Sequence, residues 1–147
     1  MATQDINNFR KYLRLINRGL GVLKKDPFEL GLSLSQCHIL VDLNNEIDPI
    51  IAKDVATRLN LEKSSVSRLL KDLDEKGLIK TKENKDDKRA KLILITPKGK
   101  SAAEKINDSS NKTVARIFTH LNQDDINKVI VGFSIFSEGI QSVKEKK

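Results

Sequence analysis

The sequence predicts a mainly α-helical fold with one small β-hairpin, in the α+β class. Two observations lead to this prediction. Six stretches of the 147-residue chain repeat apolar residues at the three- and four-residue spacing of a helix face. A single pair of short strand-like runs, around residues 79–81 and 92–96, flanks a densely charged segment.

The composition indicates a globular domain from a reducing compartment. Hydrophobic residues make up 38% of the chain and charged residues 32%, which is typical of a folded, soluble protein. No run approaches the roughly 18 apolar residues of a membrane span, and the N-terminal stretch lacks the apolar region of a signal peptide. The single cysteine, Cys37, excludes an internal disulfide. We therefore expect a cytoplasmic protein.

The positive charge is concentrated in the middle third of the chain. The net charge is +7, and residues 53–100 hold 14 Lys and Arg against 8 Asp and Glu. The segments on either side are almost balanced. A localised cationic excess is typical of proteins that bind a polyanion.

The first two predicted helices are separated by a loop. The first covers about residues 5–25, and its apolar face consists of Phe9, Leu13, Ile16 and Leu20. Residues that disfavour a helix then interrupt the pattern: Gly21, Pro27 and Gly31. The second helix has Ser33 or Ser35 as its N-cap and ends near residue 45. Its apolar stripe consists of Leu34, Cys37, Ile39, Leu40 and Leu43.

Two further helices follow with a tight turn between them. The first of this pair is short, over residues 52–59, and the small Ala56 lets its partner approach closely. Asn60 suits a left-handed turn residue, and Leu61 points back into the core. The second helix begins at once and ends at Gly77, the usual position of a terminating glycine. This arrangement is a helix-turn-helix.

The second helix of the pair has two chemically different faces. Val66, Leu69, Leu70 and Leu73 form its apolar face. The opposite face, here called the donor face, consists of Ser64, Ser67, Arg68 and Lys71. In the first two turns of the helix, this face therefore carries only hydrogen-bond donors and cations. These turns form the N-terminal end of the helix, and the N-terminal end of a helix favours anions.

A charged hairpin comes directly after this helix. Its strands lie near residues 79–81 and 92–96, and its tip, "KENKDDKRAK", is too polar to pack. A helix-turn-helix followed by such a hairpin predicts a winged helix-turn-helix.

Two long helices complete the chain. Thr96 as N-cap and Pro97 at the first position open a helix that runs towards Leu121, and a last helix covers about residues 123–144. With the first helix, they carry more apolar surface than a small winged domain can cover. We expect these faces to pack on each other or on a second subunit.

Four stretches of this sequence resemble the MarR family of bacterial winged-helix transcription regulators. They are "LSLSQCHIL", "LNLEKSSVSRLLKDLDEKGLI", "DDKRA" and "ITPKGK", within residues 32–100. The resemblance implies a homodimer that binds double-stranded DNA at a palindromic operator. Residues 32–100 would form the DNA-binding lobe, and residues 1–31 and 101–147 the helical dimerisation region.

The resemblance also implies which residues contact DNA. The recognition helix, in the major groove, would use Lys63, Ser64, Ser65, Ser67, Arg68 and Lys71. Only Arg68 among them can make a bidentate contact to guanine. The wing, in the minor groove, would use Lys82, Lys85, Asp87, Lys88, Arg89 and Lys91. Asp87 would orient Arg89, and the lysines would attract phosphate.

A regulator of this kind is expected to be a repressor released by a small-molecule effector, often an aromatic acid in this family. Arg14, Arg18 and Arg116 are candidate carboxylate partners, on charge alone. Cys37 lies on an apolar stripe and is expected in the core, while a structural or surface role is expected for His38. We expect no metal and no cofactor, because the sequence has no matching ligand set.

Two other functions remain open from sequence. Nothing resembles a phosphate loop, a metal-binding histidine pair or a nucleophile elbow, so an enzyme is not expected. A winged helix can instead be a protein-interaction module, but the polar donor face argues against that alternative. A sequence-tolerant architectural DNA binder would keep the same fold and the same cations.

Overall fold

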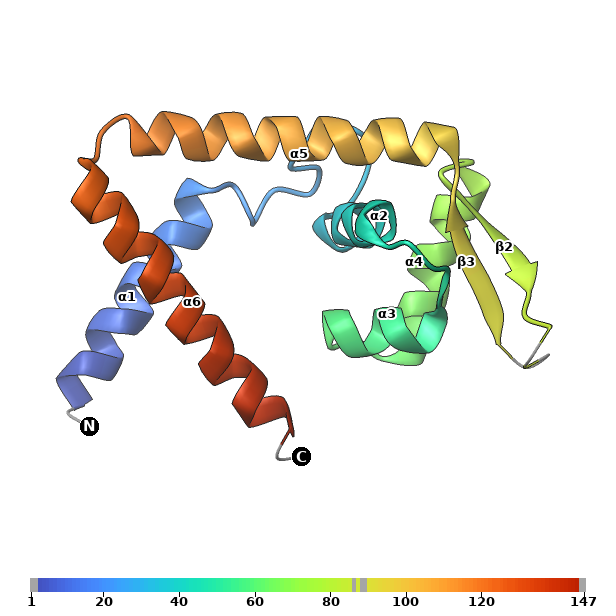
Figure 1. Cartoon of the computed structure of the whole chain (residues 1–147), viewed down its shortest axis with the longest axis horizontal. Coiled ribbons are helices and arrows are strands. Elements are labelled where there is room, and N and C mark those ends of the chain that lie inside the picture. Colours follow the sequence, from blue (N-terminus) through green and yellow to red (C-terminus); the bar gives the residue numbers. More distant parts are fainter. Residues whose placement is uncertain (1–2, 86, 88–89, 146–147) are drawn as a thin grey trace. The chain divides into compact units, whose positions relative to one another are not determined.

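The computed structural model describes residues 3–85, 87 and 90–145, and it confirms the mainly α-helical fold with a small sheet (Figure 1). The chain divides into two compact units, Met1–Ser109 and Ser110–Lys147. The elements in order are α1 (Thr3–Gly19), α2 (Leu34–Asn45), β1 (Ile50–Ile51), α3 (Ala52–Leu59), α4 (Lys63–Glu75), β2 (Ile79–Glu83), β3 (Lys91–Ile95), α5 (Pro97–Phe118) and α6 (Gln123–Glu145).

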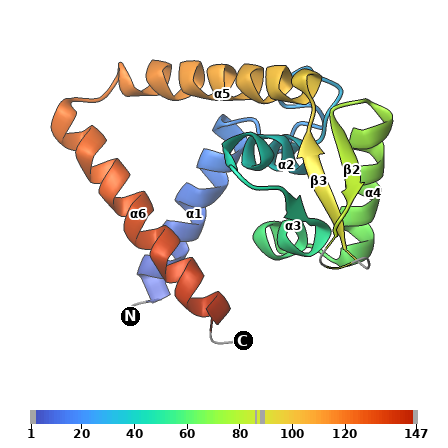
Figure 2. The ribbon, with the colours of Figure 1, turned by 45° about the vertical axis from the view of Figure 1, so that its right-hand side comes forward.

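The hydrophobic core lies in the first unit, where α2, α3 and α4 gather beside the sheet (Figure 2). Leu40, Val66 and Leu73 are completely buried, and Ile79 and Ile93 bring the sheet into the same cluster. Burial of one such side chain contributes about 1.5–3 kcal/mol. The core therefore fixes the side of α4 that faces inward.

The start of α2 is fixed by a reciprocal cap. Ser33 is the N-cap, and its hydroxyl accepts a hydrogen bond from the backbone N–H of Gln36. The side-chain oxygen of Gln36 accepts in return from the backbone N–H of Ser33 at 2.9 Å. Of the two serines proposed as the cap, Ser33 is therefore the correct one.

The turn between α3 and α4 matches the sequence prediction. Asn60 adopts the left-handed conformation, with φ 52° and ψ 47°. The N–H of Leu61 then donates to the carbonyl of Ala56 at 3.0 Å, and Leu61 packs against the core. Gly77, with φ 69°, ends α4 as predicted.

The sheet has three antiparallel strands in the order β1-β3-β2. The hairpin of β2 and β3 was predicted, but β1 was not. Ile50 of β1 lies opposite Ile93, and Ile51 lies opposite Leu92. A strand of two residues is too short to show the alternation by which a strand is recognised in sequence. It joins the middle of β3 to the start of α3.

The beginning of α5 packs directly on the turn that follows α4. Thr96 is the cap, and its hydroxyl accepts from the N–H of Gly99 at 3.1 Å. A Cβ atom added to Gly99 would lie 2.0 Å from the carbonyl oxygen of Leu78. The glycine in "ITPKGK" is therefore required by this close backbone approach.

The first helix is shorter than predicted. We expected it to reach about residue 25, but α1 ends at Gly19, and Gly21 has a φ of 70°. In the loop that follows, the carboxylate of Asp26 accepts from the N–H groups of Leu30 and Gly31 at 3.0 and 2.7 Å. This loop delivers Leu32 to the core.

The terminal helices expose large apolar side chains in the single chain. No residue of α1 is buried, and Phe9, Leu13 and Ile16 are all at least 38% exposed. In the second unit, Phe133 and Ile140 of α6 are 55% and 45% exposed. Among the described residues, no helix is long and apolar enough to cross a membrane.

Candidate nucleic-acid interface

The recognition helix, α4, presents the two faces expected of it. Val66, Leu70 and Leu73 are buried. The residues of the donor face are exposed, and so is Lys63 at the start of the helix. Ser65 departs from the expectation, because it is half-buried and lines a cavity beside α2. Packing of the apolar face thus leaves the hydroxyls and cations in solvent.

Several donor side chains of α4 make contacts with residues of the same helix. The hydroxyl of Ser67 donates to the carbonyl of Lys63 at 2.9 Å, and Nε of Arg68 donates to the carbonyl of Ser64 at 3.4 Å. Lys71 forms an exposed ion pair with Glu75 at 3.7 Å. Exposed pairs contribute about 0–1 kcal/mol, so reorienting Lys71 towards a phosphate costs little.

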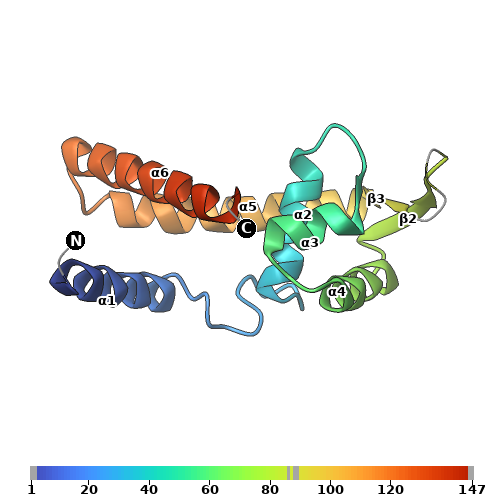
Figure 3. The ribbon, with the colours of Figure 1, turned by 90° about the horizontal axis from the view of Figure 1, so that it is seen from below.

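The wing extends beyond α3 and α4 (Figure 3). Lys82, Lys85, Asp87 and Lys91 are exposed. The backbone N–H of Ala90 donates to the carbonyl of Asp87 at 3.0 Å. Lys88 and Arg89 lie outside the described residues, so the orientation of Arg89 by Asp87 stays a prediction.

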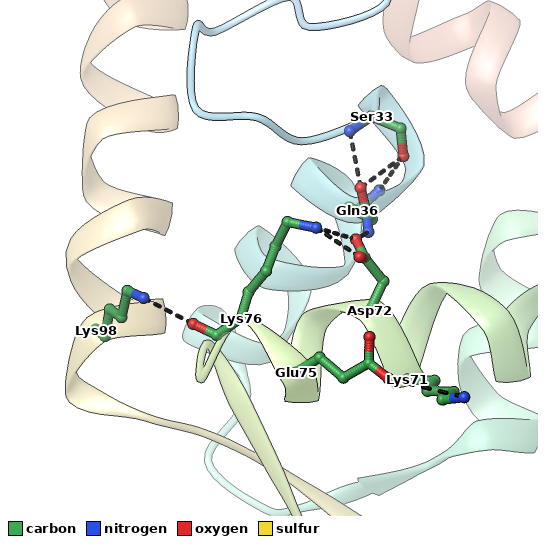
Figure 4. A network of polar contacts seen from close by, with 7 residues as sticks. All are labelled: Ser33, Gln36, Lys71, Asp72, Glu75, Lys76 and Lys98. Carbon is green, nitrogen blue, oxygen red and sulfur yellow. Dashed lines mark hydrogen bonds and ion pairs between the residues drawn. The ribbon is translucent and has the colours of Figure 1, made fainter.

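A polar network that we did not predict joins α2 to the recognition helix (Figure 4). The side-chain amide of Gln36 donates to a carboxylate oxygen of Asp72, and the same carboxylate accepts from Lys76. Hydrogen bonding from Lys76, and then from Gln36, lowers the pKa of Asp72. We named only Ser33 or Ser35 as the cap; the pattern of Ser33 followed by Gln36 three residues later could have indicated a capping box, but nothing in the sequence indicates the contact of Gln36 with α4.

The candidate sensor residues have the surroundings that were expected. Cys37 is 1% exposed, and burial raises the pKa of its thiol to about 11. A protonated, enclosed thiol is a poor nucleophile and a poor metal ligand. His38 is exposed on the surface of α2. Within the described part of the chain, no three potential ligands are grouped to hold a metal ion.

The arginines proposed for an effector are all exposed. Arg14 and Arg18 lie on α1, and Arg116 lies near the end of α5. The cavity of about 430 Å³ beside α4 and another of about 330 Å³ beside the start of α5 are lined by other residues. The role of these three arginines in binding an effector therefore remains a proposal based on charge.

A helix-turn-helix with an exposed donor face, followed by a wing, defines a winged-helix DNA-binding protein. A model of the winged helix DNA-binding domain matches residues 32–99. The regulator TcaR of Staphylococcus aureus is 30% identical over 128 residues, which cover 86% of this chain and 83% of TcaR. The chain belongs to the MarR family of transcriptional regulators. It is a DNA-binding regulator and not an enzyme.

Solved structures support the fold over nearly the whole chain. FabT of Streptococcus pneumoniae, solved in complex with DNA, has a TM-score of 0.78 and 17% identity, covering 97% of this chain and 99% of FabT. Sco3205 of Streptomyces coelicolor, a MarR family regulator also solved with DNA, has a TM-score of 0.77 and 17% identity, covering 96% and 90%. The helices outside residues 32–99 thus belong to the shared fold.

Proposed function

We propose that this protein is a homodimeric, sequence-specific repressor in the cytoplasm, which binds a roughly palindromic operator and is released by a small-molecule effector. The observation that carries the proposal is the exposed donor face of α4 opposite an apolar face of which Val66, Leu70 and Leu73 are buried and Leu69 is partly buried. Arg68 can donate two hydrogen bonds to a guanine, which distinguishes bases by about 1–3 kcal/mol. The serines and lysines around it position the helix on phosphates.

The wing adds a second contact under this proposal. Arg89 enters a minor groove, where a narrow groove concentrates negative potential. Lys82, Lys85, Lys88 and Lys91 attract phosphates without regard to sequence. The 14 cations of residues 53–100 support this assignment. The wing therefore strengthens binding and favours AT-rich flanks.

The dimer is proposed from the exposed apolar residues of the terminal helices. Residues 1–31 and 101–147 would cover these surfaces by pairing with a second copy. Two copies related by a twofold axis present two recognition helices, which is why a palindromic operator is proposed. An effector that favours a dimer with a different spacing of these helices would release DNA. Arg14, Arg18 and Arg116 remain the candidate partners for an effector carboxylate.

The test is selection of bound duplexes from a random-sequence pool at physiological salt. The wild type is compared with Arg68→Ala and with Arg10→Ala, which removes one exposed cation from α1 and serves as the charge-matched control. We expect the wild type and the control to enrich a palindrome whose half-sites lie about one helical turn apart. Arg68→Ala should lose one position of the motif.

Other outcomes would contradict the proposal. Salt-sensitive retention without any motif would indicate an architectural DNA binder. Absence of retention would favour a protein-interaction module. Addition of benzoate, a simple aromatic carboxylate, to the wild-type complex tests the effector class, and release of DNA is the expected result.

A further inference from the structure

The side chain of Gln36 is the one buried polar side chain in the part of the chain that the structure describes, at 5% exposure. Its oxygen accepts from the backbone N–H of Ser33 at 2.9 Å and from the Ser33 hydroxyl at 3.1 Å. Because the oxygen meets two donors, the NH₂ group must point the other way. It points at Asp72 of the recognition helix, as Figure 4 shows.

Asp72 lies on α4 close to residues proposed to contact DNA. It lies one turn after Arg68 and two turns after Ser65, on the side of the helix next to α2. Its carboxylate also accepts from Lys76, and the backbone carbonyl of Lys76 accepts from Lys98 of α5 at 2.7 Å. One chain of polar contacts therefore holds α4 from α2 on one side and from α5 on the other.

The contact between α2 and α4 lies beside an open groove on the surface. An open groove of about 430 Å³ lies beside the start of α2 and α4, and Gln36, Arg68 and Asp72 all line it. The apolar core holds α2 and α4 together, and the polar contact adds an interaction of defined direction beside this groove. The hydrogen bond from Gln36 to Asp72 spans the two helices at this position.

We propose that Gln36 is a positioning residue for DNA recognition, which holds Asp72 and thereby sets the angle at which α4 presents Arg68. This inference rests on the proposed function, because it assumes that α4 reads an operator. Base contacts require donor–acceptor distances within about 0.3 Å of the optimum. A small tilt of α4 would therefore weaken specific binding while leaving phosphate attraction intact.

The test measures the ratio of affinities for the selected operator and for a scrambled duplex of equal length. Gln36→Met keeps the length of the side chain and removes the two hydrogen bonds it accepts from Ser33 and the one it donates to Asp72, leaving Asp72 paired with Lys76. Gln36→Glu places a second carboxylate against Asp72. We expect each variant to lower the ratio by about tenfold, the effect of losing the hydrogen bond between α2 and α4. Affinity for the scrambled duplex should stay within about threefold of the wild type.

A rescue variant separates positioning from general damage. In Gln36→Glu with Asp72→Asn, the new carboxylate still accepts from Ser33, and the new amide donates in the opposite direction across the gap. The net charge of the wild type is conserved, and we expect most of the operator preference to return. Asp74→Asn, which removes an exposed carboxylate of the same helix, is the control for the single change Asp72→Asn.

Each result is decisive. A wild type without operator preference would refute the proposed function and not the role of Gln36 alone. A wild type with operator preference, together with a Gln36→Met variant that keeps it, would overturn the positioning role. Equal loss of affinity for both duplexes in Gln36→Met, with a lowered melting temperature, would show a purely structural role and would also overturn it.

Discussion

The hydroxyl group of Thr96 donates a hydrogen bond of 2.8 Å to the carbonyl oxygen of Gly77. The backbone N–H of Thr96 also donates to the carbonyl of the next residue, Leu78, at 3.1 Å. These contacts connect the first residue before α5 to the turn that ends the recognition helix. A change at the start of α5 therefore acts on α4 through backbone atoms, which cannot move aside as a flexible side chain can.

The first prediction concerns Gly99, which lies against the same turn. Gly99→Ala should destabilise the fold by about 1–3 kcal/mol, because the added methyl group overlaps the carbonyl of Leu78. Urea denaturation followed by circular dichroism measures this loss. Gly19→Ala is the control, since nothing lies within 4 Å of an added Cβ at that glycine. Equal stability of the two variants would refute the close packing at Gly99.

The second prediction concerns the wing. Arg89→Ala should weaken operator binding by about 1 kcal/mol or more and reduce the preference for AT-rich flanks, without unfolding the protein. Lys85→Ala should instead weaken all duplexes alike and lower the salt dependence by about one counterion. Titrations at several salt concentrations distinguish the two effects. If Arg89→Ala left affinity unchanged, the assignment of the wing would be wrong.

The third prediction concerns the dimer. The wild type should have the mass of two chains at micromolar concentration, because monomers would expose the apolar residues of α1 and α6 to water. Phe133→Asp should shift the mass to one chain. Asn127→Asp places the same charge on another side of α6 and should leave the dimer intact. Analytical ultracentrifugation measures the mass of the wild type and of both variants. A monomeric wild type would contradict the proposal that the terminal helices pair with a second copy.

The fourth prediction concerns Cys37. With a pKa of about 11, roughly one thiol in a thousand is ionised at pH 8, and the group is enclosed as well. Labelling by an aromatic disulfide should therefore be at least about a hundredfold slower in the native protein than in urea. Rapid labelling of the folded protein would reopen a redox role for this cysteine.

Local patterns in the sequence were sufficient to predict most of the fold. Asn60 and Gly77 could be assigned because each turn requires a backbone conformation that few residues adopt readily. The two faces of α4 followed from the 3.6-residue period. These features depend on residues that are close to one another in the chain, and such local patterns can be recognised directly in the sequence.

The rest depends on residues that are distant in sequence. The contact between Gln36 and Asp72 joins positions 36 residues apart, and neither side chain is unusual at its own position. Strand β1 exists because β3 offers it a partner, since two isoleucines alone have no period. The end of α1 was misplaced because apolar residues continue at helical spacing beyond Gly19, while the backbone turns at Gly21.

The position of β2 at the edge of the sheet has a consequence for solubility. An edge strand offers backbone donors and acceptors on which another polypeptide can assemble, and a flat apolar edge promotes fibrous aggregation. Lys80 and Lys82 are both exposed along β2. Two cations on such a strand repel the same strand of another molecule. Replacing them by threonines should therefore make concentrated protein precipitate, in addition to any loss of phosphate attraction at Lys82.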